Sequence, residues 1–212
     1  GVKEKLGLRP TDFLILTFWI KDQMLDKMWY EKGLIALREE LDSTDIDAVC
    51  SMNFSIYMRD ALYENYFSIK RSILSFAEFQ KTHLKTIWEW NTNIREQDEL
   101  YGKLITENNI KTAHINFMLD RHMSIGEMIM LLRRRDALVP KDVEFIIGGV
   151  IDLPKIYKVL NSLPGRKVYI MNSIPFMLAS YRKKVNGGSR QFDLTAAELY
   201  QHNFKYYQAL NK

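Results

Sequence analysis

The sequence predicts an α/β fold in which short parallel strands alternate with helices. Two β-branched runs, Val143–Val150 and Lys167–Asn172, flank a segment of about one helix's length. This pattern is typical of a βαβ unit, whose two strands run parallel. A strand-like run followed by a helix-like segment recurs along the whole chain, about six times. We therefore expect one domain over residues 1–212, built as an open sheet or as an incomplete, TIM-like barrel of about six strands with a C-terminal helix.

The expected strands are short runs rich in β-branched and aromatic residues, bounded by polar or turn-forming residues. In chain order they are Phe13–Ile20, Ala48–Ile56, Lys85–Asn91, Thr112–Leu119, Val143–Val150 and Lys167–Asn172.

Apolar residues spaced three and four apart predict helices between the strands, each burying one face. Two Ser/Thr-x-x-Glu sequences, Ser124–Glu127 and Thr195–Glu198, are typical of capping boxes and predict helix starts. The run Arg133–Arg135 is favourable at a helix C-terminus, beside the negative end of the dipole. The expected helices are roughly Leu25–Leu41, Arg59–Thr82, Arg95–Asn109, 124–135, Leu153–Leu160 and a closing helix, Ala196–Leu210.

Composition limits the classes of protein that the chain can belong to. A net charge of +4 and a pI near 9.0 fit a nucleic-acid partner but do not require one. Cys50 is the single cysteine, which excludes an internal disulfide and a structural zinc site of several cysteines. It also fits a reducing compartment such as the cytoplasm. No apolar run reaches 18 residues, so we expect no transmembrane helix.

Polar residues occupy alternate positions in several expected strands, although parallel strands buried on both faces are normally apolar throughout. An unpaired buried polar group costs about 1–3 kcal/mol. Two interpretations stay open: the polar side chains line a pocket for a polar ligand, or they pair with each other or with water. The residues concerned are Ser51, Asn53 and Ser55 in the second strand, Glu89 and Asn91 in the third, His114 and Asn116 in the fourth, and Asn172 in the sixth.

Individual residues suggest roles at the carboxyl ends of the strands, where ligands bind in α/β folds. Glu89 is a candidate general acid or base, and a structural hydrogen-bond acceptor is the alternative. Asp120 follows the fourth strand and is a second catalytic candidate. Gly148 and Gly149 end the fifth strand, where they form either a ligand-lining loop or a plain tight turn.

A basic loop follows the sixth strand, and Lys183, Lys184 and Arg190 in it are candidates for contacts with phosphates. The residues His114, Asp120 and His122 lack the spacing of metal ligands, so the sequence predicts no metal and no cofactor.

The segment Phe145–Val150, followed by Leu163-Pro164 and Lys167–Met171, resembles the tRNA-guanine transglycosylase family over about thirty residues. The resemblance implies a TIM-like barrel that exchanges guanine in a nucleic acid for a deazaguanine base, with phage and bacterial relatives acting on DNA. It implies that Gly148 and Gly149 border the base. The zinc cysteines of that family and its Asp-Ser-Gly-Gly-Phe-Gln segment are missing. The segment Asn53–Tyr57 also resembles an α/β family of phages and mobile elements.

Two functional hypotheses follow. In the first, the chain is an enzyme of transglycosylase type that modifies a nucleobase, in DNA in preference to RNA, with Glu89 and Asp120 as catalytic residues. In the second, it is a non-catalytic, degenerate barrel that holds a nucleotide or a partner protein. Whether further strands come from a second copy or another chain stays open. In the first hypothesis, the substrate-binding residues are Asn53, Ser55, Asn91, Asn116, Gly148, Gly149 and Asn172.

Overall fold

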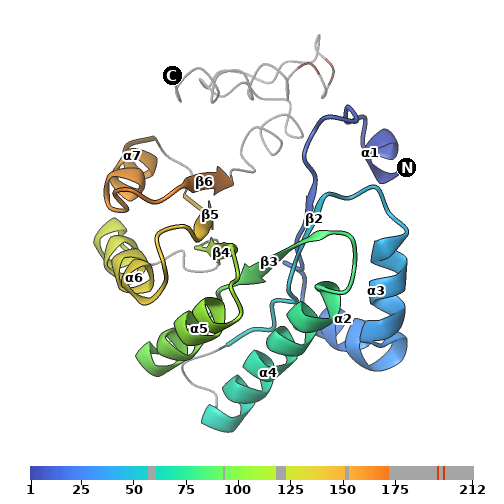
Figure 1. Ribbon diagram of the computed structural model, residues 1–212, viewed down its shortest axis with the longest axis horizontal. Coiled ribbons are helices and arrows are strands. Elements are labelled where there is room, and N and C mark those ends of the chain that lie inside the picture. Colours follow the sequence, from blue (N-terminus) through green and yellow to red (C-terminus); the bar gives the residue numbers. More distant parts are fainter. Residues whose placement is uncertain are drawn as a thin grey trace.

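A six-stranded, fully parallel sheet forms the centre of the protein. The computed structural model describes residues 1–56, 61–92, 94–117, 123–150 and 153–171, together with Thr195 and Glu198. The strands follow one another in the order β1-β2-β3-β4-β5-β6, and the sheet curls into half a barrel with the helices along its outer side (Figure 1). The predicted α/β class is therefore confirmed.

Each strand lies within the run that predicted it and is shorter. The strands are β1 (Ile15–Leu16), β2 (Ala48–Cys50), β3 (Lys85–Glu89), β4 (Thr112–Asn116), β5 (Glu144–Gly148) and β6 (Val168–Met171). The helices are α1 (Val2–Lys5), α2 (Asp22–Lys27), the π-helix η1 (Met28–Lys32), α3 (Leu34–Asp42), α4 (Leu62–Phe79), α5 (Arg95–Glu107), α6 (Ile125–Leu138) and α7 (Leu153–Asn161). Of these described helices, none has the length and apolarity needed to cross a membrane.

The two sides of the sheet have different partners because side chains alternate along each strand. The outward-facing residues pack with the helices in a large apolar core that includes Trp88, Trp90, Tyr101, Ile115 and Phe145. The inward-facing residues form a separate, smaller apolar cluster near the axis of the half-barrel. Its members are Ile15, Ala48, Cys50, Ile87, Ile146 and Met171.

The prediction of a single helix over Leu25–Leu41 is wrong. Three helices, α2, η1 and α3, cover this region, and the helical path is interrupted at Gly33, which has a φ of 78°. A φ in this range is left-handed and ends a right-handed helix, and glycine adopts it without the strain that a Cβ would add.

Both capping boxes form. Ser124 Oγ accepts a hydrogen bond from the Glu127 amide at 3.3 Å, and the Glu127 carboxylate accepts one from the Ser124 amide at 2.6 Å. The amide of Glu198 likewise donates to Thr195 Oγ1 at 3.2 Å, and the Thr195 amide donates to the Glu198 carboxylate at 2.7 Å. The rest of the expected helix Ala196–Leu210 lies outside the described residues.

A buried ion-pair network ties α5 and α6 to the end of β3. Asp98 is fully buried, and its Oδ1 accepts hydrogen bonds from Trp90 Nε1 at 2.8 Å and from Arg135 Nε at 2.9 Å. Thr92 and Arg134 also bind this carboxylate. Two members of the arginine run therefore neutralise a core carboxylate, a role that the helix-dipole argument did not predict.

The environment of Asp98 favours its charged form. Burial by itself raises the pKa of this carboxyl, but the charge of Arg135, the hydrogen bond from Thr92 and the charge of Arg134 together outweigh burial and lower it. The resulting stabilisation is complete above the unfolded-state pKa of about 3.9. It is lost as the pH falls through the lower pKa of the folded state.

We expect Asp98→Asn to lower the free energy of unfolding by about 3–5 kcal/mol, because two guanidinium groups lose the buried charge that neutralises them. The loss of stability below about pH 4 should also become shallower than in the parent protein. Urea unfolding followed across pH measures both effects.

The neighbouring Glu99→Gln change is the matched control. Glu99 pairs with Arg95 on the exposed side of α5, with an Nε–Oε1 distance of 2.8 Å and side chains 49% and 74% exposed. Such a pair contributes less than about 1 kcal/mol. Equal losses in the two variants would contradict the importance of the Asp98 network.

Candidate functional site

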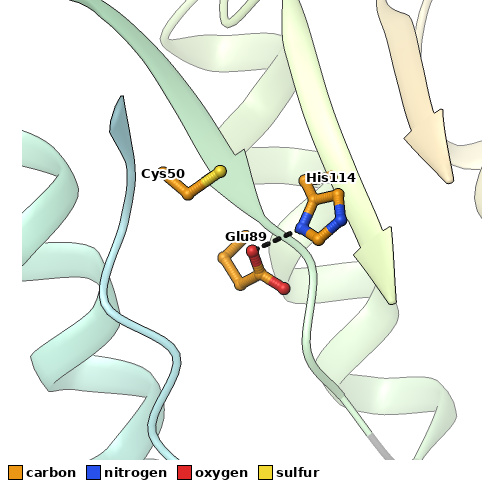
Figure 2. Close-up of side chains that lie close together, drawn as sticks. All are labelled: Cys50, Glu89 and His114. Carbon is orange, nitrogen blue, oxygen red and sulfur yellow. Dashed lines mark hydrogen bonds and ion pairs between the residues drawn. The ribbon is translucent and has the colours of Figure 1, made fainter. Parts of the chain in front are cut away.

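A carboxylate–imidazole pair lies on the inner side of the sheet. Glu89 is the last residue of β3, and the parallel register places it directly beside His114 of β4. His114 Nδ1 lies 2.6 Å from Glu89 Oε2, and the two residues are 1% and 2% exposed (Figure 2). A carboxylate accepts, so Nδ1 carries the shared proton when Glu89 is ionised. The pair is the arrangement that orients an imidazole for proton transfer.

Trp19, which follows β1, covers this pair. Its ring packs against the imidazole of His114, with centroids 4.6 Å apart and planes tilted by 30°. Its indole Nε1 also donates a long hydrogen bond of 3.4 Å to Glu89 Oε1. Directly after the neighbouring strand β2, Ser51 Oγ accepts a hydrogen bond of 3.0 Å from the Glu89 amide. Contacts from both sides therefore hold Glu89 in place.

Cys50, at the end of β2, completes the cluster. One ligand atom from each of Cys50, Glu89 and His114 lies within 4.8 Å of the others, and all three side chains are buried. Figure 2 shows the Cys50 side chain directed toward the place where Glu89 and His114 meet. Burial, with the nearby charge of Glu89, raises the pKa of the Cys50 thiol well above its usual range. Without a cation beside it, this sulfur therefore stays protonated.

Gly148 allows close packing on the other side of His114. A Cβ at this position would lie 2.8 Å from Trp19 Cη2, 3.3 Å from His114 Nε2 and 3.4 Å from Asn116 Oδ1. His114 Nε2 is buried and has no hydrogen-bond partner among the described residues. The predicted residues Asn116 and Gly148 are therefore neighbours of His114. The next residue, Gly149, has a φ of 83°, as expected for a turn at this end of β5.

Other predicted site residues form contacts of their own. The Asn91 amide donates to Asn53 Oδ1 at 2.7 Å and to the Phe54 carbonyl at 3.1 Å. Ser55 Oγ donates to Asp22 Oδ1 at 2.9 Å. These polar groups thus pair with protein atoms, as the second interpretation of the polar positions expects.

The remaining candidates lie outside the described residues. They are Asp120, Asn172, Lys183, Lys184 and Arg190.

Trp19 and Cys50 were not predicted from the sequence, and His114 was assigned to the polar face of its strand but not to the catalytic or substrate-binding residues. Cys50 alternates with Ser51, so the polar pattern assigned it to the opposite side of the strand from the site. The parallel register instead pairs Cys50 with Ile87, two residues before Glu89, so Cys50 shares the inner side with Glu89 and His114. Cys50 could have been identified from the sequence only if its thiol, at the end of an apolar run, had been counted as a polar group.

Comparison with known proteins adds no assignment: no protein-family model matches the sequence, and no curated protein is significantly similar to it. The resemblance to the tRNA-guanine transglycosylases therefore stays a prediction.

We expect Gly148→Ala to destabilise the protein by about 1–3 kcal/mol, since the added methyl group forces Trp19 and His114 to move. Gly126→Ala in α6 is the matched control. Its Cβ would meet only Ser124 Oγ, at 3.8 Å, so the change should stabilise by about 0.4–1 kcal/mol. Urea unfolding of both variants measures these opposite effects, and a stabilised Gly148→Ala protein would contradict the close packing of Trp19 and His114 against Gly148.

We expect the folded protein to react very slowly with a disulfide reagent that labels thiols, and to react with one equivalent once unfolded in urea. Cys50 is 1% exposed, and its raised pKa keeps the thiolate scarce at pH 8–9. The absorbance of the released chromophore measures the rate. Rapid labelling of the folded protein at pH 8 would show that Cys50 is accessible.

Proposed function

We propose that the protein is an enzyme of transglycosylase type that exchanges a nucleobase in a nucleic acid. The observation that carries the proposal is the buried Glu89–His114 pair. Nε2 of His114 faces Gly148 and has no hydrogen-bond partner among the described residues. A pair of this kind, at the carboxyl end of parallel strands, suits general acid–base catalysis.

In this reaction, His114 exchanges protons with the two bases. The step begins with His114 in its doubly protonated form. The glycosidic C1′–N bond breaks, its electron pair leaves with the ring nitrogen of the departing base, and His114 supplies from Nε2 the proton that this nitrogen takes up, while C1′ is left electron-poor for attack by the incoming base. The incoming base then forms a new C1′–N bond, and its proton passes to His114, so the exchange leaves the enzyme unchanged. Glu89 holds Nδ1–H and stabilises the charged imidazole. These contacts favour Glu89 as the residue that orients His114.

Three features support a nucleobase as the substrate. The segment around Gly148 and Gly149 resembles a base-lining segment. Asn116, beside Gly148, carries an amide side chain of the kind that recognises a base edge. The net charge of +4 fits a polyanionic partner, with DNA preferred to RNA and Lys183, Lys184 and Arg190 as candidate phosphate contacts.

The alternative is a non-catalytic barrel that holds a nucleotide or a partner protein. The pairing of Asn91 with Asn53 favours it, because these amides are already bound within the protein. The near-complete burial of Glu89 and His114 also fits a structural polar layer.

We expect the protein to incorporate a deazaguanine base into DNA, as detected by mass spectrometry of the digested nucleosides. Glu89→Gln and His114→Gln should each lower the rate by about 10²–10⁴-fold, since the acid–base pair is lost. His83→Gln, at an exposed histidine bound to Asp42, is the matched control and should keep full activity. Unchanged nucleosides with the parent protein would rule out this reaction. Nucleotide binding that survives Glu89→Gln, without turnover, would favour the binding protein.

A further inference from the structure

We propose that Cys50, Glu89 and His114 bind a divalent metal ion of the zinc type. The residues come from the ends of β2, β3 and β4, and their ligand atoms lie within 4.8 Å of one another. Around a tetrahedral zinc ion, with bonds of about 2.0–2.3 Å, ligand atoms lie about 3.3–3.6 Å apart. Side-chain movements of roughly 1 Å, including a separation of His114 Nδ1 from Glu89 Oε2, would therefore create that geometry.

The chemistry of the three donors suits this class of ion. A thiolate, an imidazole nitrogen and a carboxylate oxygen are the ligands that zinc accepts in proteins, whereas magnesium and calcium prefer oxygen alone. Two anionic ligands and a neutral imidazole also balance the charge of a divalent ion. A neutral complex is the form in which charged groups are least costly to bury, and all three side chains are buried.

The unpaired nitrogen of His114 is an independent indication. Because Nδ1 is bound to Glu89, Nε2 of the neutral ring is an acceptor, and it lacks a donor among the described residues although His114 is 1% exposed. When a metal takes Nδ1, the ring proton moves to Nε2, which becomes a donor. Both this atom and the acceptor Asn116 Oδ1 lie beside Gly148, 3.3 Å and 3.4 Å from the place a Cβ would take. Metal-bound histidines commonly donate their second N–H to such an acceptor. The thiol proton of Cys50 is released to solvent.

The site would differ from a structural zinc site. Three protein ligands leave a fourth position for water or for a substrate atom, as in catalytic zinc sites. The inference goes beyond the proposed function, because binding is measured without any substrate. An ion on Glu89 and His114 also withdraws both from proton transfer, so the ion would inhibit the base exchange proposed above.

The test is a titration of the metal-free protein with Co²⁺, followed by competition with Zn²⁺. Because the chain has one cysteine, a cobalt–thiolate charge-transfer band can arise only from Cys50. We expect this band at one equivalent of Co²⁺, together with the visible bands of tetrahedral cobalt, and we expect Zn²⁺ to abolish both.

Two variants and one control make the result specific. Cys50→Ser should lose the charge-transfer band, and His114→Gln should weaken binding by at least about tenfold. Circular dichroism shows whether each variant is folded. His83→Gln removes an exposed histidine bound to Asp42 and should bind cobalt like the parent. No thiolate band in the folded parent protein, or unchanged affinity in His114→Gln, would overturn the proposal.

Discussion

The parallel register of β2, β3 and β4 is the constraint on which the candidate site depends. Parallel strands present alternate side chains to the same side, and neighbouring residues in register lie side by side. Here Cys50 pairs with Ile87, two residues before Glu89 and on the same side of β3, and Glu89 pairs with His114. The three polar side chains therefore share the inner side, and one ligand atom from each lies within 4.8 Å of the others. A shift of one residue in any of the three strands would turn one of them toward the helices and separate the cluster.

Two buried carboxylates show how differently the fold treats a core charge. Asp98 has two arginines, an indole N–H and a hydroxyl group as partners, so its charge is fully compensated. Glu89 has the imidazole of His114 and one long hydrogen bond from Trp19 as side-chain partners. The first arrangement fixes α5 and α6 to the sheet, and the Asp98 carboxylate is fully used by these partners. The second arrangement leaves Glu89 with fewer partners, and both proposals therefore place their chemistry at this residue and His114.

The two proposals use the same atoms for different chemistry. A proton between Glu89 and His114 supports acid–base catalysis, whereas an ion beside Cys50 removes that proton and turns the pair into ligands. Gly148 serves both arrangements, because the absence of a Cβ lets Trp19 and His114 pack against β5.

The sequence by itself determined the features that depend on local chemistry. Runs of β-branched residues predicted all six strands, and both capping boxes formed as their residues indicated. Gly33 ended a helix that apolar spacing had extended through it, because its left-handed φ is not visible in a hydrophobic pattern. Polar residues in the strands identified Glu89 and Asn116 as candidates and placed His114 on a polar face, and the glycine pair at the end of the fifth strand identified Gly148.

Only the tertiary structure decided which of those residues meet. Three sets of contacts join segments far apart in the chain. Asn91 pairs with Asn53, Cys50 lies beside Glu89 and His114, and Asp98 binds Arg134 and Arg135. Such contacts follow from strand register and from the curl of the sheet, which the packing of the whole core sets. A local pattern can show that a strand carries a polar face, but the direction of that face is determined by its neighbours.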